Sequence, residues 1–199
     1  MMAKALKAFA RAKEGVAALE FALIAPLMIV VLFTSLELVN MLQSNQRVEN
    51  TAISLADVIS RDTSISNAEM TGIWSAVGSL MFPDNAAGMD LRITSIVFDD
   101  DGDASVVWSE VCGLTAAGAC SGSSYSVLRR GAAVPASELP NVNPPGSSLI
   151  RVEVAFDFRP IVGFFSIGEN GELGHDGGIT TLRHTAFRRS RLVDPIPRV

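Results

Sequence analysis

The chain has 199 residues, of which 48% are hydrophobic, and a formal net charge of −5. It is long enough for one membrane segment and one compact domain of about 140 residues. The acidic balance argues against nucleic acid as a partner, because nucleic-acid binding relies on clustered Lys and Arg.

Residues 1–15 form a basic leader. Its charges are Lys4, Lys7, Arg11 and Lys13 against Glu14, a net +3 that leaves −8 for the remainder. An apolar run follows and ends near Leu36; with its first residues it reaches the roughly 20 residues needed to cross hydrocarbon. No small-x-small cleavage site follows the run, which excludes an ordinary secretory signal. The positive-inside rule places the N-terminus in the cytoplasm and most of the chain outside.

Glu20 lies at the start of this run, where a charge needs an explanation. An unpaired charge costs on the order of 3 kcal/mol at the centre of a span and less near its edge. One interpretation is an uncleaved signal anchor whose Glu20 reaches the headgroups. In the other, a peptidase cuts after Gly15, Val16 gains a free amine, and Glu20 becomes the fifth residue of the mature chain. Residues four apart share a helix face, so the Glu20 carboxylate can pair with such an amine, its own or a neighbour's.

Residues 15–26, GVAALEFALIAP, resemble the start of the TadE-like minor pilins, or pseudopilins, of the tight-adherence (Flp) pilus system. In that family a glycine precedes the cut, an aromatic residue follows the glutamate, and a proline comes a few residues later. Here these are Gly15, the pair Glu20 and Phe21, and Pro26. The resemblance is specific over about residues 11–40.

The resemblance implies cleavage between Gly15 and Val16 by a prepilin peptidase, and residence in the bacterial inner membrane as a single-pass protein. The domain beyond the membrane would then lie in the periplasm or in an extracellular pilus. The implied partners are other pilins and pseudopilins, the peptidase and the inner-membrane assembly platform. Glu20 would set the register of assembly, with Phe21 beside it in the motif.

The apolar run continues as an amphipathic pattern, so the sequence predicts one helix over about 16–61, roughly 70 Å long. Residues 16–37 would be its membrane half, and 38–199 the exported domain. Pro26 lacks an N–H, which predicts a kink in the helix. After a polar break, Ser66 or Asn67 is positioned to cap a second helix over about 68–80.

Two strands, 91–98 and 104–111, flank an Asp-Gly turn and predict a hairpin. Asp99, Asp101 and Asp103 in that turn also suit a calcium ion, although the twelve-residue loop with its terminal glutamate is missing. The turn is therefore either a plain solvated hairpin tip or a calcium site.

Cys112 and Cys120 are the only two cysteines, and in an oxidising compartment an isolated pair predicts a disulfide. A metal site is the alternative, but further cysteine ligands are lacking. The segment 121–147 is loop-like, with a short edge strand or turn at 124–130.

Strict alternation over 149–159 predicts a strand with one buried and one solvated face. The buried face would hold Ile150, Val152, Val154, Phe156 and Phe158 under the long helix, and the solvated face Arg151 and Glu153. A last strand is expected over 179–188, followed by a basic tail, 188–191. Together these elements give an α+β, type IV pilin-like fold with an antiparallel sheet of about four strands.

His175 and His184 belong to no nucleophile motif and have no metal-ligand spacing. We therefore expect no enzyme and no cofactor, and a role in self-association as a minor pilin. The alternative is an uncleaved single-pass envelope protein whose exported domain binds a ligand or scaffolds a complex.

Overall fold

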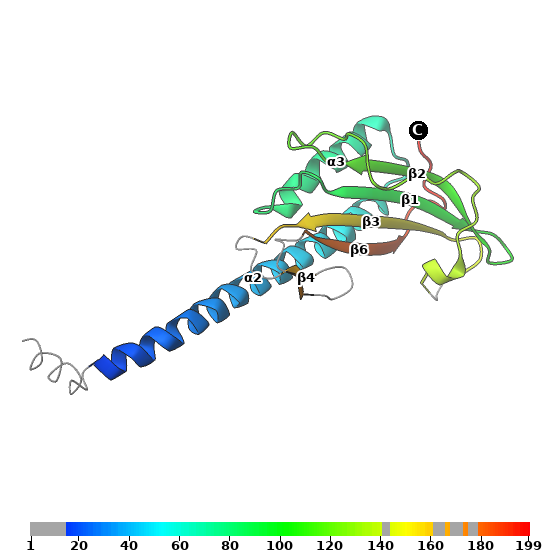
Figure 1. Ribbon diagram of the computed structural model, residues 1–199. Coiled ribbons are helices and arrows are strands. Elements are labelled where there is room, and N and C mark those ends of the chain that lie inside the picture. The colour runs from blue at the N-terminus through cyan, green and yellow to red at the C-terminus, as the bar shows by residue number, and fades with distance from the viewer. Residues whose placement is uncertain (1–14, 141–143, 161–165, 168–172, 175–178) are drawn as a thin grey trace, which may run out of the picture.

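The computed structural model describes residues 15–140, 144–160, 166–167, 173–174 and 179–199. One long helix, α2 (Val16–Ile59), leaves a domain in which a second helix and a sheet pack together (Figure 1). The sheet has four antiparallel strands in the order β2-β1-β3-β6. The expected α+β fold is therefore confirmed, with the helices on one face of the sheet.

Helix α2 has 44 residues and continues without a break past Pro26. Its second half carries an apolar stripe that packs on β3 and β6. Three- and four-residue spacing places these side chains on one face. The buried members are Ser44, Val48, Thr51, Ala52, Leu55, Ala56 and Ile59. The expected cover of the sheet by this helix is confirmed.

Helix α3 (Asn67–Met81) begins at a capping box. The Ser66 hydroxyl accepts the backbone N–H of Glu69, and the Glu69 carboxylate accepts the backbone N–H of Ser66 at 2.7 Å. These hydrogen bonds to the charged form lower the pKa of Glu69. The cap choice left open by the sequence is thus settled in favour of Ser66.

The sheet is built from β1 (Asp90–Phe98), β2 (Ala104–Gly113), β3 (Ser148–Phe158) and β6 (Thr180–Arg189). A bulge in the β1–β2 pairing follows Ser95, which opposes Trp108, whereas Ile96 opposes Val106. The extra residue moves Val106 to the outer face of the sheet. There it joins a small apolar cluster with Ile96, Phe98, Ala104, Val134 and Leu149.

The outer face of β3 is less solvated than the alternation predicts. The inward positions are buried as expected, but Arg151 on the other face is only 3% exposed. The reason is the loop after β2, with its 3-10 turn η2 (Ala136–Glu138), which covers that face. The carboxylate of Glu138 in the turn lies 2.8 Å from a guanidinium nitrogen of Arg151, so the buried cation is paired.

The same loop brings Tyr125 over the guanidinium of Arg92, 4.9 Å from the ring centroid. Arg92 also donates two hydrogen bonds to Glu153, of 2.6 and 2.7 Å, and this pairing raises the pKa of Arg92. Residues 124–130 form no strand, so the suggested edge strand is wrong and the turn interpretation fits better. Side-chain contacts hold the loop at Tyr125, and backbone hydrogen bonds between residues 131–134 and β2 hold it further along.

The C-terminal segment packs into the core, which the sequence did not indicate. Ile196 is fully buried, and the indole N–H of Trp108 donates to its carbonyl oxygen at 2.8 Å. Arg198 pairs with Glu110 at 2.9 Å. The basic tail is likewise tied to the domain, because Arg191 forms an ion pair with Asp57 of α2.

The remaining short pairing joins β4 (Ser166–Ile167) to β5 (Leu173–Gly174). At the end of β2, the predicted disulfide between Cys112 and Cys120 is present. A bridge of this loop length contributes about 2.5 kcal/mol in the chain-entropy account. The bonded loop folds back so that the N–H of Ser121 donates to the carbonyl of Gly113 at 2.8 Å.

Gly113 is required by this close approach, because a Cβ there would overlap the carbonyl oxygen of Gly122. We predict that Gly113→Ala lowers the free energy of unfolding by about 1–3 kcal/mol, since backbone atoms must shift. Gly78→Ala on α3 is the matched control, because a Cβ there meets nothing within 4 Å. It should raise stability by about 0.5–1 kcal/mol through helix propensity. Denaturant unfolding of the oxidised full chain in detergent measures both, and equal effects would refute the close-approach argument.

Candidate assembly interface

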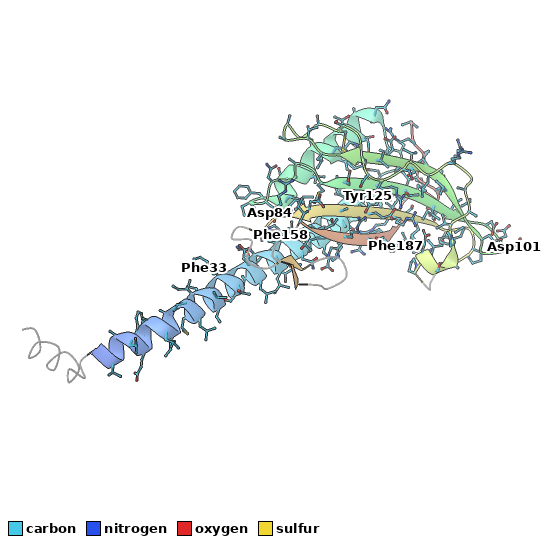
Figure 2. All side chains as sticks on the ribbon, viewed as in Figure 1. Phe33, Asp84, Asp101, Tyr125, Phe158 and Phe187 are labelled. Atoms are coloured by element: carbon cyan, nitrogen blue, oxygen red, sulfur yellow. A yellow bond between two sulfur atoms is a disulfide. The ribbon has the colours of Figure 1, made fainter. Side chains whose placement is uncertain are left out.

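The first half of α2 is an apolar rod without a partner in the described structure. Figure 2 shows it projecting from the domain, with Phe33 along it. The side chains that are exposed there run from Val16 to Leu42. Of the described residues, α2 alone forms a helix long and apolar enough to cross a membrane, and none of its apolar window is buried.

Two hydroxyl side chains within this rod are satisfied by the helix itself. Thr34 donates its hydroxyl hydrogen to the carbonyl of Val30, and Ser35 to that of Leu32, both at 2.8 Å. Hydroxyls bonded in this way present no orphan donor to hydrocarbon. Lipid or neighbouring helices can therefore surround this part of α2 at little polar cost.

Gly15 is the N-cap residue of α2, and the local fold does not require a glycine there. Its φ is −86°, an angle open to every residue type, and its position has no side-chain cap. A Cβ built on Gly15 meets nothing within 4 Å. The glycine therefore has no explanation in backbone strain or packing among the described residues. The leader, residues 1–14, lies outside them.

Glu20 is exposed one helical turn after Val16, so the two share a face. Within residues 15–140 and the other described segments, its carboxylate has no hydrogen bond or ion pair. Phe21 beside it is 73% exposed. A carboxylate and an aromatic ring are thus both presented outward at the start of an apolar rod.

The second half of α2 is held firmly by the domain. Arg47 pairs with Asp84, in the turn after α3, at 2.9 Å. The side-chain oxygen Oδ1 of Asn45 accepts a 2.9 Å hydrogen bond from Nε2 of His184 on β6. These contacts on two sides, added to the buried stripe, fix the direction in which the rod leaves the domain. His184 thus has a packing role, whereas His175 lies outside the described residues.

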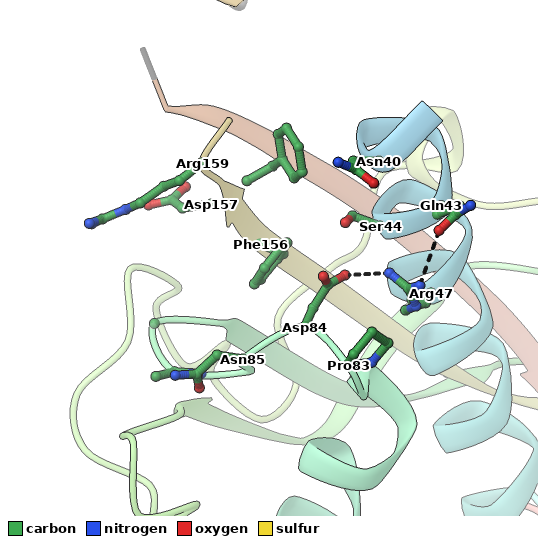
Figure 3. Close-up of a pocket in the computed structure, with 13 residues that line it drawn as sticks. Asn40, Gln43, Ser44, Arg47, Pro83, Asp84, Asn85, Phe156, Asp157 and Arg159 are labelled. Atoms are coloured by element: carbon green, nitrogen blue, oxygen red, sulfur yellow. Dashed lines mark hydrogen bonds and ion pairs between the residues drawn. The ribbon is translucent and has the colours of Figure 1, made fainter. Parts of the chain in front are cut away.

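A cavity of about 640 Å³ lies where the rod enters the domain (Figure 3). Figure 3 shows Arg47 at its wall, bonded to Asp84 and reaching Gln43. Polar side chains from α2 and the turn after α3 face aromatic residues from the end of β3. The lining includes Asn40, Gln43, Ser44, Arg47, Pro83, Asp84, Asn85, Phe156, Phe158 and Arg159. Sequence reasoning missed this cavity because it depends on how three distant segments meet.

The acidic hairpin tip is organised by its own backbone. Asp99 accepts the backbone N–H groups of Asp101 and Asp103 at 3.1 and 2.8 Å. Gly102 has φ +85°, as the turn requires. In the described part of the chain, no group of three or more His, Cys, Asp or Glu side chains could hold a metal ion. One carboxylate of the calcium candidate is therefore already engaged in closing the turn.

Comparison with known proteins gives one finding. The family model described as TadE-like protein matches residues 15–56, about a fifth of the chain. That match covers Gly15, Glu20, Phe21 and Pro26, and it confirms the resemblance inferred from these residues. A search of curated proteins and a search of solved structures gave no match.

Proposed function

We propose, from the TadE-like character of residues 15–56, that the chain is a minor pilin or pseudopilin supporting assembly of a tight-adherence pilus. A prepilin peptidase would remove the leader after Gly15, leaving Val16 as the first residue. The mature chain would act by self-association with related subunits rather than by catalysis. The single observation that carries this proposal is an unpartnered apolar rod with a carboxylate at its start.

The glycine supports the processing step. Among the described residues, neither backbone conformation nor packing calls for glycine at position 15, which supports recognition by another protein as the reason for it. A peptidase that must fit the backbone closely at the scissile bond is such a protein. The bond after Gly15 also lies at the first turn of α2, beyond the folded domain and open to approach.

The carboxylate supports the assembly step. Glu20 in a bilayer without a partner costs up to about 3 kcal/mol, depending on its depth. Cleavage would create an ammonium group at Val16, on the same helix face. In a bundle of such helices the carboxylate can pair with its own or a neighbouring amine, which recovers part of that cost. Pairing with a neighbour would fix the axial stagger between subunits.

The small side chains of α2 support close helix contact. Ala18, Ala22 and Ala25 recur at four- and three-residue spacing, on the face opposite Glu20. Small residues let two helix backbones approach closely in a membrane. The proposed rod would therefore offer one face for close packing and another for the charge pair.

The proposal also fixes how the chain would be oriented in the membrane. The basic leader would remain in the cytoplasm, and the domain would lie on the outer side of the inner membrane before assembly. The proposed partners are other pilins of the system, the peptidase and the inner-membrane platform. The disulfide between Cys112 and Cys120 suits an oxidising compartment outside the cytoplasm.

Glu20→Ala tests the register role in native membranes. We expect the variant to insert as the parent does, while the yield of products cross-linked to other pilins falls about tenfold, equivalent to about 1.4 kcal/mol. Glu49→Ala is the matched control, because Glu49 is exposed on the same helix but outside the apolar half. An unchanged yield for Glu20→Ala, or an equal loss for Glu49→Ala, would count against the proposal.

A further inference from the structure

Of the described residues, three other segment ends lie at the end of the domain from which α2 leaves. The turn after α3, the C-terminal end of β3 and the start of β6 meet there, and Figure 2 shows Asp84 and Phe158 near the base of the rod. In the pairing of β3 with β6, Phe158 opposes Thr180. We call this end, defined by Phe82, Asp84, Phe158 and Ile179, the proximal rim.

The length of the rod places the proximal rim close to the membrane surface. Exposed apolar side chains extend from Val16 to Leu42, about 39 Å along the helix, whereas the hydrocarbon of a bilayer is about 30 Å thick. With Glu20 at the cytoplasmic edge, hydrocarbon covers about Phe21 to Asn40. The next turn of α2, up to about Ser44, then lies in the headgroup layer, and Arg47 lies at its outer surface. Arg47 contacts the proximal rim through Asp84.

The proximal rim carries exposed apolar side chains at that level. Phe82 is 78% exposed, the largest fraction among the large hydrophobic residues described outside the rod. Ile179, one residue before β6, is 49% exposed. Neither side chain has a role in the core, and both belong to the end of the domain that meets α2. Apolar side chains at this depth gain by entering the boundary between headgroups and acyl chains.

The cavity beside the proximal rim is lined by charges of both signs. Its lining combines Arg47 and Arg159 with the carboxylates of Asp84 and Asp157, neutral polar groups of α2 and the aromatic ring of Phe156. Arg47 is already paired with Asp84 at 2.9 Å, whereas Arg159 is exposed at the end of β3. Within the described lining, Arg159 is therefore the cation that can meet a lipid phosphate.

We propose that the proximal rim rests on the phospholipid bilayer, with Phe82 and Ile179 inserted into its interfacial layer. This second membrane contact rests on the membrane residence proposed above, but not on leader cleavage or on a role in a pilus. It holds the domain at a fixed tilt against the membrane. Extraction of the subunit into a filament must then break this contact as well as the span.

Tryptophan quenching in vesicles tests the contact. The full chain is reconstituted in phosphatidylcholine and phosphatidylglycerol vesicles, with or without lipids brominated near the headgroup end of the acyl chain. The native Trp74 and Trp108 are buried and set the background in the parent. Phe82→Trp is the probe, and Leu192→Trp is the matched control, since Leu192 is 63% exposed near the opposite end of the domain. Phe33→Trp reports insertion of the rod.

We expect quenching of Phe82→Trp at least about twofold above the parent, and quenching of Leu192→Trp equal to the parent, because only the proximal rim reaches lipid. Quenching of Phe33→Trp without quenching of Phe82→Trp would overturn this inference and leave membrane residence intact. Absence of quenching in Phe33→Trp would overturn both. Equal quenching of Phe82→Trp and Leu192→Trp would show general collapse of the domain onto lipid, and would also refute the inference.

Discussion

Replacing Gly15 by valine will leave the leader attached while the domain folds as before. Among the described residues nothing requires glycine at this position, so a β-branched side chain should not change the unfolding transition. A peptidase that fits the backbone closely will be blocked by that side chain. We expect the processed fraction to fall from nearly all of the protein to below detection. Immunoblotting of native membranes, where the two forms differ by 15 residues, measures this fraction.

The unfolding transition of Gly15→Val is the internal control. If it matches the parent while processing is lost, the effect belongs to recognition rather than to folding. Normal cleavage of this variant would mean that glycine is not read at the junction. A loss of stability would instead mean that position 15 has packing contacts with the leader, and the argument from its free surroundings would fail.

Replacing Val48 by aspartate will unfold the domain. Val48 is fully buried on the stripe of α2 that covers the sheet. The substitution removes about 1.5–3 kcal/mol of apolar burial and places an unpaired carboxylate in the core, at a further cost of several kcal/mol. The total is comparable with the whole stability of a domain of this size. Loss of protease resistance and of the thermal transition in detergent would report the outcome.

Val58→Asp is the control for this substitution. It introduces the same side chain on the same helix, ten residues later, where valine is 52% exposed. We expect its effect on stability to stay within about 0.5 kcal/mol, as for other surface changes. Similar behaviour of the two variants would refute the assignment of the buried stripe. It would also remove the rigid connection between the apolar rod and the sheet.

Local patterns in the sequence were enough to predict most of the helices and strands. A cap at Ser66 or Asn67 was predicted for α3, and the structure shows a Ser66–Glu69 capping box, whose hydrogen bonds lie within four residues. The buried face of β3 and the Asp-Gly turn after β1 are equally local, and both predictions are confirmed, whereas the predicted solvated face of β3 is largely covered. The disulfide was predictable because two cysteines leave a single intramolecular pairing.

The features that sequence reasoning missed all depend on distant contacts. Arg151 is buried because a loop that ends before β3 returns over the sheet and supplies Glu138. Val106 changes face because of a bulge that no residue pattern announces. Ile196 is buried because Trp108, 88 residues earlier, offers an indole N–H to its carbonyl. The proximal rim belongs to the same class, since it joins the ends of three separate segments.

In the candidate site, too, some features could be predicted from the sequence and others are shown only by the structure. Gly15, Glu20 and Phe21 were recognisable because the motif shared with the family and the chemistry expected of these residues both lie within one short segment. The structure adds that Gly15 has no local reason to be glycine and that α2 runs unbroken through Pro26. The kink expected at Pro26 stays a prediction, because an unbroken helix can still bend there.

The intact mass of the protein isolated from its own cells tests the central claim most directly. The account predicts a chain that begins at Val16, with the free amine that Glu20 is proposed to meet. A chain that still begins with Met1, in cells with an active prepilin peptidase, would contradict it. The rod would then be an uncleaved anchor, and the pilus subunit would have to be abandoned as the function.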